Sequence, residues 1–91
     1  MNPFNIHIEH EQHPLTLTIL PENHQYKIIY DGKIAGALRQ LDNDWELLAM
    51  EEIDPEGLPI ISAEELKLEK LNLDTPTLNQ ITGEIENYIR A

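Results

Sequence analysis

Three histidines near the N-terminus are the first candidates for chemistry in this chain. His7, His10 and His13 are interspersed with the carboxylates of Glu9 and Glu11. Imidazole and carboxylate groups are suitable ligands for zinc or nickel. On an extended strand His7 and Glu9 project to the same face, but the spacing matches no zinc-binding helix motif, and the end of a hairpin seldom positions metal ligands well. A solvated hairpin rim explains the histidines better, so we predict no metal site.

The remaining polar residues form no recognisable reactive set. The run Asp42-Asn43-Asp44 is similar to the start of a calcium loop, but Leu47 stands where that loop needs glycine and Ile53 where it needs a bidentate glutamate. The pair Glu51-Glu52 lies in a polar run, which favours solvated carboxylates over an acid–base pair in an apolar pocket. The chain contains no cysteine, which excludes thiol nucleophiles and disulfides. We therefore predict that the protein is not an enzyme and binds no cofactor.

The elements around these residues are organised by a meander of three strands between Tyr26 and Met50. Asp31-Gly32 lies between two apolar runs and predicts a type I′ turn, since both residue types tolerate positive φ. The first turn predicts the cross-strand pairs Tyr30–Lys33, Ile29–Ile34, Ile28–Ala35 and Tyr26–Ala37. A second turn at Asp42-Asn43 predicts the pairs Leu41–Asp44, Gln40–Trp45, Arg39–Glu46 and Leu38–Leu47, with an ion pair between Arg39 and Glu46.

Both faces of this meander are predicted to be apolar, although an antiparallel sheet usually has one polar face. The first face carries Ile29, Ile34, Gly36, Leu38, Trp45, Leu47 and Ala49. The second face carries Tyr26, Ile28, Tyr30, Ala35, Ala37, Leu48 and Met50. We expect the second face to be covered by the C-terminal part of the chain, by a twin subunit or by a partner, and we predict these seven residues as an interaction surface. A one-residue error in register would exchange the faces.

Two further strands precede the meander. Residues 4–9 alternate between apolar and polar side chains, and residues 15–20 do the same. A polar turn over residues 10–14 joins these strands into a hairpin, and a turn over residues 21–24 leads into the meander. The first fifty residues therefore predict five consecutive antiparallel strands.

The character of the sequence changes after Met50. Residues 51–61 contain two prolines and a glycine and predict a connecting loop. Ser62-Ala63-Glu64-Glu65 matches a capping box and predicts a short helix through about Leu71, with a strand as the alternative. Thr75 is predicted as the N-cap of a terminal helix with Pro76 in its first turn. That helix has an apolar stripe made of Leu78, Ile81, Ile85, Tyr88 and Ile89, and Gly83 is expected to let it approach the sheet.

These elements predict the fold class α+β: a five-stranded antiparallel β-meander packed against one or two C-terminal helices in two layers. Residues 1–91 are expected to form a single domain, with the β-meander in 1–50, a loop in 51–61 and a helical part in 62–91. The N-terminus has no basic head and no continuous apolar segment, so we expect neither a signal peptide nor a membrane span, and a cytoplasmic protein.

The net charge of −11 bears on partners. Between Asp42 and Glu69 there are ten acidic residues and one basic residue, Lys67, which argues against direct binding to nucleic acid or to an anionic membrane. We therefore predict a small soluble acidic module that binds another protein, including a second copy of itself as a homodimer, through an apolar sheet face. The alternative is an acidic antagonist, a nucleic-acid mimic, of a basic or nucleic-acid-binding protein. A metal carrier or an enzyme ranks last.

Overall fold

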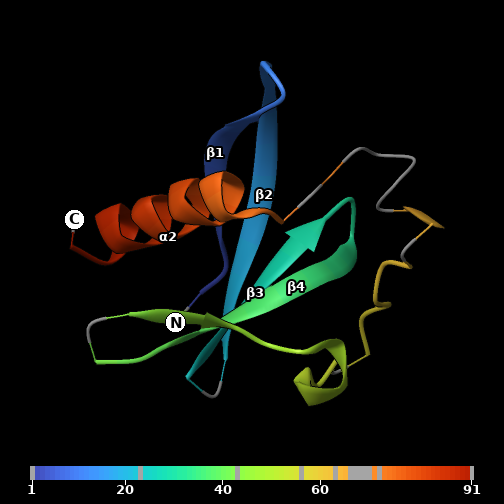
Figure 1. Cartoon of the computed structure of the whole chain (residues 1–91). Coiled ribbons are helices and arrows are strands. Elements are labelled where there is room, and N and C mark those ends of the chain that lie inside the picture. The colour runs from blue at the N-terminus through green and yellow to red at the C-terminus, as the bar shows by residue number, and fades with distance from the viewer. Residues whose placement is uncertain are drawn as a thin grey trace.

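The computed structural model describes residues 2–22, 24–42, 44–55, 57–62, 64–65, 71 and 73–90. They form one antiparallel sheet and a C-terminal helix (Figure 1). The strands follow chain order: β1 (Phe4–His10), β2 (His13–Glu22), β3 (Gln25–Tyr30), β4 (Lys33–Gln40) and β5 (Trp45–Leu47). A short 3₁₀ helix, η1 (Met50–Glu52), follows the sheet, and α2 (Thr75–Arg90) ends the fold. The predicted α+β class and the five-stranded meander are confirmed.

The first two hairpins are tighter than the sequence predicted. Glu11 and Gln12 have φ angles of 50° and 65°, so they alone form the β1–β2 turn, and His13 already belongs to β2. Both prolines of the predicted turns lie inside β2. Pro14 precedes the part of β2 that pairs with β3, and Pro21 follows the part that pairs with β1. Each proline therefore has one side without a neighbouring strand, where a missing N–H costs no ladder bond.

The predicted Asp31-Gly32 turn is confirmed, but the register beyond it is wrong after two pairs. Asp31 and Gly32 have φ angles of 52° and 76°, and the pairs Tyr30–Lys33 and Ile29–Ile34 form as predicted. The register then shifts between Ile28 and Ile29, so the pairs are Ile28–Gly36 and Tyr26–Leu38, in place of Ile28–Ala35 and Tyr26–Ala37. Ala35 is the extra residue of a β-bulge. A bulge changes which side chains share a face, so the two predicted faces are corrected from this point on.

The β4–β5 hairpin has the predicted register. Leu38–Leu47, Arg39–Glu46 and Gln40–Trp45 are paired, and Arg39 forms an ion pair with Glu46. The Leu41 amide donates to the Asp44 carbonyl at 2.8 Å, which closes the turn, while Asn43 lies outside the described residues. The strand is shorter than predicted, because it ends at Leu47 and Met50 begins η1.

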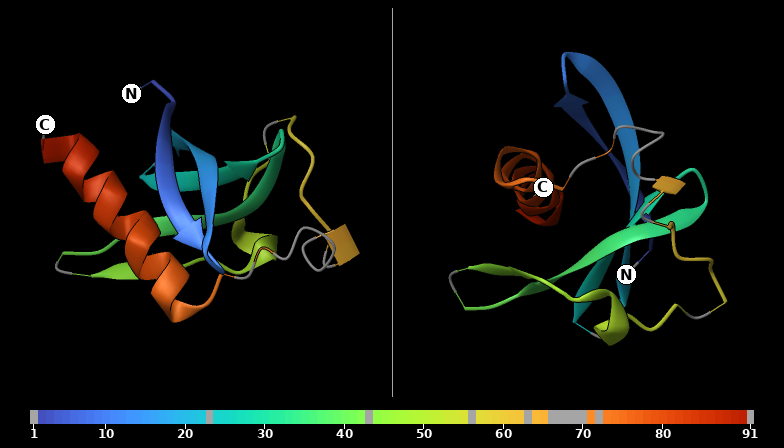
Figure 2. Two further views of the ribbon diagram at one scale, coloured as in Figure 1. Left: turned by 90° about the horizontal axis from the view of Figure 1, so that it is seen from above. Right: turned by 45° about the vertical axis from the view of Figure 1, so that its right-hand side comes forward.

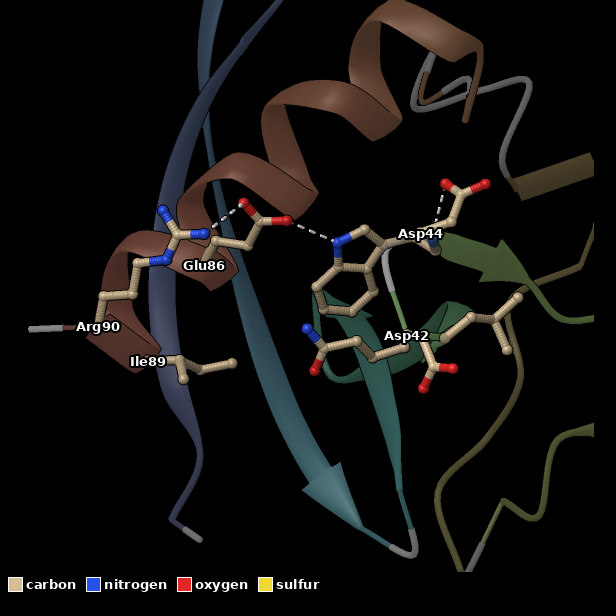
Figure 3. Close-up of a pocket in the computed structure, with 8 residues that line it drawn as sticks. Asp42, Asp44, Glu86, Ile89 and Arg90 are labelled. Carbon is tan, nitrogen blue, oxygen red and sulfur yellow. Dashed lines mark hydrogen bonds and ion pairs between the residues drawn. The ribbon is translucent and has the colours of Figure 1, made fainter.

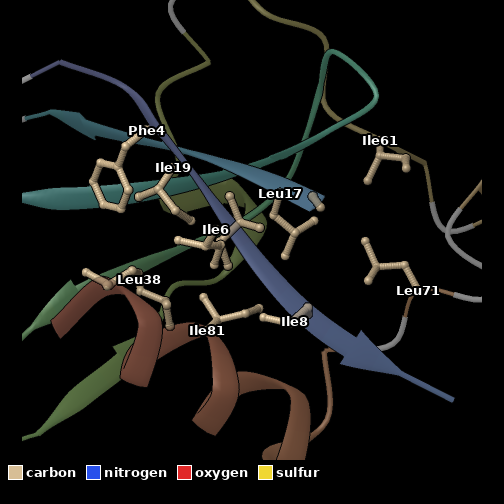
Figure 4. Close-up of a cluster of buried hydrophobic side chains, with 12 residues drawn as sticks. Phe4, Ile6, Ile8, Leu17, Ile19, Leu38, Ile61, Leu71 and Ile81 are labelled. Carbon is tan, nitrogen blue, oxygen red and sulfur yellow. The ribbon is translucent and has the colours of Figure 1, made fainter. Parts of the chain in front are cut away.

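The main core lies between the concave side of the sheet and α2. Figure 2 (right) looks along α2 and shows the sheet curving around it, with β1 and β2 on one side and the β4–β5 hairpin on the other. Ile81 of α2 is fully buried against apolar residues from the strands (Figure 4). Ile85, one turn further along α2, is also fully buried. The buried members of this cluster are Phe4, Ile6, Ile8, Leu17, Ile19, Ile28, Ala35, Leu38, Ile61, Leu71, Ile81 and Ile85.

A second, smaller core lies on the other side of β4. It consists of Ile34, Ala37, Leu48 and Ile53, with Leu58 packed against it. The chain returns to β4 once more, since Ile34 and Ile60 form a parallel bridge. Apolar side chains therefore lie on both sides of β4, although not in the two sets that were predicted, and residues that follow β5 cover the second side.

The start of α2 differs from the prediction by one residue. Asp74, and not Thr75, is the N-cap, because its Oδ1 accepts a hydrogen bond from the Thr77 amide at 3.0 Å. Aspartate is at least as good an N-cap as threonine, which explains the choice. The expectation for Gly83 is also wrong, since a Cβ at this position would meet nothing within 4 Å and the glycine allows no close approach.

The predicted helix after Ser62 lies largely outside the described residues. Glu64 and Glu65 are helical, and the Glu65 amide donates to Ser62 Oγ at 3.1 Å. The Ser62 hydroxyl also bonds to the Glu65 carboxylate at 3.3 Å. Lys33 forms an ion pair with Glu65, and the hydrogen bond from Lys33 is the main reason why the pKa of Glu65 lies below its usual value.

Candidate functional site

The seven residues predicted as an interaction surface do not form one exposed patch. Ile28 and Ala35 are fully buried in the main core, and Ala37 and Leu48 are buried in the second core. Tyr26 and Tyr30 pack against the main core, and Met50 alone is exposed. The β-bulge is the reason for this separation, because it divides residues that an unbroken ladder would have aligned.

An open cleft lies between the β4–β5 hairpin and the last turns of α2. It has a volume of about 370 Å³, at the small end of the range of roughly 300–1,000 Å³ that is usual for ligand pockets. Figure 3 shows Asp42 and Asp44 on the hairpin, and Glu86, Ile89 and Arg90 on α2. The lining residues are Gln40, Leu41, Asp42, Asp44, Trp45, Glu86, Ile89 and Arg90.

A smaller cleft adjoins the first one at Trp45. Its volume is about 170 Å³, and it shares Trp45 and Asp44 with the larger cleft. Its other lining residues come from β4, β5 and the first half of α2: Leu38, Leu47, Thr75, Leu78, Asn79 and Thr82. We call the two clefts together the Trp45 groove. The larger cleft is rich in carboxylates, whereas the smaller one adds leucines and neutral polar groups to the shared Asp44 and Trp45.

The position of Trp45 is set by one contact with α2 and one with β3. Its indole Nε1–H donates to Glu86 Oε1 at 2.8 Å, which ties the hairpin to α2. Its ring meets that of Tyr26 edge to face, with centroids 5.4 Å apart. Both arrangements are favourable for a partly buried tryptophan, whose N–H needs an acceptor. Trp45 is thus held firmly while parts of its surface line the two clefts.

Negative charge predominates around the larger cleft. Asp42 and Asp44 are exposed on the hairpin side, and Glu86 lies on the helix side. Arg90 is the single cation among the described residues that line the cleft, and its guanidinium is 3.9 Å from Glu86 Oε2. Apolar surface lies beside these charges, because Leu41 is 44% and Ile89 39% exposed. The site can therefore hold a group that is both cationic and partly apolar.

The N-terminal histidines do not converge on a common point. His7 is exposed and bonds to the Thr16 hydroxyl, His10 is buried, and His13 is exposed. Successive odd and even positions of β1 face opposite sides of the sheet, so His7 and His10 point apart. In the part of the chain that the structure describes, no three histidine or acidic side chains are grouped as metal ligands would be.

His10 instead belongs to a hydrogen-bonded network at the start of α2. His10 Nδ1 lies 3.2 Å from the hydroxyl of Thr77, which is buried. A hydrogen bond from the Thr77 side chain is the main cause that lowers the pKa of Asp74, followed by the bond from the Thr77 amide, and the charge of His10 acts in the same direction. The threonine hydroxyl is thus engaged with the helix cap, which indicates a structural role.

The sequence predictions placed several residues of the groove correctly but did not identify them as a site. It correctly paired Trp45 with Gln40, and it placed Ile89 on the apolar stripe of the helix. The signal for the site was the combination of Leu41, Asp42 and Asp44 around a solitary tryptophan. That signal could not show that α2 passes alongside this hairpin, because the contact joins residues about forty positions apart in the chain.

Comparison with models of protein families, with curated proteins and with solved structures finds no match for this chain. None of the helices in the described ranges is long and apolar enough to cross a membrane.

Proposed function

We propose that this protein is a non-enzymatic protein–protein interaction module that receives a segment of its partner in the Trp45 groove. The observation that carries the proposal is an open cleft of about 370 Å³ beside the single tryptophan of the chain. Aromatic residues are enriched among the side chains that dominate binding energy at protein interfaces. The exposed Leu41 and Ile89 at the same cleft add apolar area that a partner would remove from water.

A different protein is a better partner for this groove than a second copy of the chain. The predicted reason for self-association was an uncovered second sheet face, and residues after β5 cover that face at β4. Two copies would also bring together two chains with a net charge of −11 each, which opposes association at moderate ionic strength. Direct binding to nucleic acid or an anionic membrane is disfavoured for the same electrostatic reason. A cytoplasmic location remains part of the proposal.

A second candidate function is an acidic antagonist of a basic or nucleic-acid-binding protein. It is favoured by exposed carboxylates between the β4–β5 hairpin and η1, on Asp42, Asp44, Glu51 and Glu52. A mimic of a phosphate backbone would bind through many distributed charges, so its affinity would fall steeply with salt and would change little when one cleft is altered. For the interaction module, in contrast, the affinity for the partner should fall when the cleft is altered.

Selection from an unbiased peptide library tests the proposed function. Peptides displayed on phage are selected on the intact chain, and each clone is then tested on two double variants. Leu41→Ser with Ile89→Ser removes apolar surface at the larger cleft. Met50→Ser with Ile60→Ser removes side chains of similar exposure that do not line it. Circular dichroism and thermal unfolding establish that both double variants are folded.

The expected result is a group of peptides that bind the chain and the second double variant but lose binding to the first. Clones that bind both double variants equally would contradict the proposal, as would a selection that yields no specific clone. Binding through distributed charge would show itself as clones that are indifferent to both double variants and sensitive to salt.

A further inference from the structure

The larger cleft of the groove offers an aromatic surface between carboxylates on opposite walls. Asp42 and Asp44 stand on the hairpin, and Glu86 stands on α2, where its Oε1 accepts from Trp45. Figure 3 shows Asp42 and Ile89 on opposite sides of the cleft. A cation placed over the indole would gain from the ring quadrupole and from charges on both walls.

The chain already places one guanidinium at this cleft. Arg90 is 78% exposed, and its Nη2 lies 3.9 Å from Glu86 Oε2, at the outer limit of an ion pair. So loose a contact between exposed groups is weak and readily exchanged. This contact joins residues four positions apart within α2, so Arg90 places a guanidinium beside Glu86 in an arrangement that an incoming cation can displace.

Resting on the proposed function, we propose that the occupant of the larger cleft is an arginine side chain from an extended segment of a partner protein. The guanidinium stacks on Trp45 and pairs with the hairpin carboxylates, while a neighbouring apolar side chain enters the smaller cleft beside Leu47 and Leu78. Arginine fits better than lysine, because its planar guanidinium stacks on aromatic rings and donates two parallel hydrogen bonds to a carboxylate.

Charge complementarity selects this occupant over a second copy of the chain. The chain has 17 acidic and 6 basic residues, so most of its own segments would be repelled from a cleft lined by three carboxylates. A basic partner would instead be attracted over a distance of about 10 Å at moderate salt, which raises its rate of association.

A set of three short peptides tests the inference directly. Each is acetylated and amidated and alternates leucine with arginine, lysine or citrulline, which keeps the shape of arginine without its charge. Binding is followed by the fluorescence of Trp45, the single tryptophan, and by backbone NMR shifts. The arginine peptide is expected to bind with shifts centred on the groove, the lysine peptide more weakly, and the citrulline peptide at least about tenfold more weakly.

Matched charge variants separate the cleft from general attraction. The triple variant Asp42→Asn, Asp44→Asn and Glu86→Gln keeps acceptor oxygens for the Trp45 amide and indole. The control triple Glu11→Gln, Glu51→Gln and Glu64→Gln removes the same charge from exposed residues that do not line the groove. Binding of the arginine peptide is expected to fall about tenfold in the first triple and much less in the second. Should the first triple fail to fold, the exposed single change Asp42→Asn replaces it, with Glu51→Gln as its control.

Several outcomes would overturn the inference. Equal binding of the arginine and citrulline peptides would show that the charge plays no part. Equal losses of affinity in the two triple variants would show that the cleft plays no part. If library peptides without arginine occupy the groove while the arginine peptide does not, the inference fails and the proposed function stands. If no peptide of any composition depends on the groove, both fail.

Discussion

Replacing Gly83 by alanine is expected to stabilise the protein by about 0.5–1 kcal/mol. Gly83 lies in the interior of α2, where glycine is less favourable than alanine by this amount. The new methyl group would meet nothing within 4 Å, so no clash offsets the gain. For a chain of this length, this increase in the free energy of unfolding raises the melting temperature by about 2–8 °C. At a urea dependence of about 1 kcal/mol/M, the unfolding midpoint would rise by about 0.5–1 M.

The same substitution at Gly32 provides a control of opposite sign. A Cβ at Gly32 also meets nothing within 4 Å, but the residue has a φ of 76° in the β3–β4 turn. An alanine in this left-handed conformation costs roughly 1–2 kcal/mol. Both variants are unfolded in urea and followed by Trp45 fluorescence and far-ultraviolet circular dichroism. If Gly83→Ala left the midpoint unchanged or lowered it while Gly32→Ala behaved as expected, the assignment of an open helical site to Gly83 would be refuted.

Three further predictions concern the packing of α2 and its N-cap. Ile81 is fully buried, so Ile81→Ala should lower the free energy of unfolding by about 2–5 kcal/mol in the same urea assay; a loss below 1 kcal/mol would contradict the position of the helix in the core. The Gln80 side chain accepts a hydrogen bond from the Glu9 amide at 2.9 Å and donates one to the Glu9 carbonyl at 2.7 Å. Gln80→Leu should therefore lower the free energy of unfolding by about 1 kcal/mol and speed hydrogen exchange of the Glu9 amide. Unchanged exchange would argue against this contact. Because the folded-state pKa of Asp74 lies below its unfolded value of about 3.9, its stabilisation is complete above that value and is lost as the pH falls through the lower folded pKa. Asp74→Asn keeps a good N-cap and should lose less stability than the unaltered chain between pH 5 and about 2. Parallel plots of stability against pH for the two proteins would show that the ionised Asp74 carboxylate does not stabilise the fold.

The local parts of the fold could be predicted because their signals lie within a few residues. The Asp31-Gly32 turn follows from the positive φ that both residues tolerate, and the pairing of Arg39 with Glu46 follows from the next turn. The alternation in residues 4–9 predicted a strand that the structure extends by one residue, to His10. Each of these features depends on steric preferences of the local backbone.

The candidate site could not be predicted in the same way. The predicted interaction surface was derived from an unbroken ladder, and the bulge after Ile28 sends Ala35 and Ala37 to different cores. The actual groove needs α2 to lie beside the β4–β5 hairpin, as the bond between Trp45 and Glu86 shows. The order of the residues along the chain carries little information about such a contact, since it depends on how the whole sheet curves around the helix.

The sequence by itself determined the class of the fold, the number of strands, their order and most of the turns. Only the tertiary structure decided which side chains are hidden and which line an open cleft. The physical reason lies in β4, where residues 34–38 are all buried, so the hydrophobic pattern favours neither face. A register shift of one residue then changes the fit of the hydrophobic pattern very little, although it turns each side chain to the opposite face. Packing against α2 and against the segment after β5 resolves this ambiguity, and with it the position of the groove.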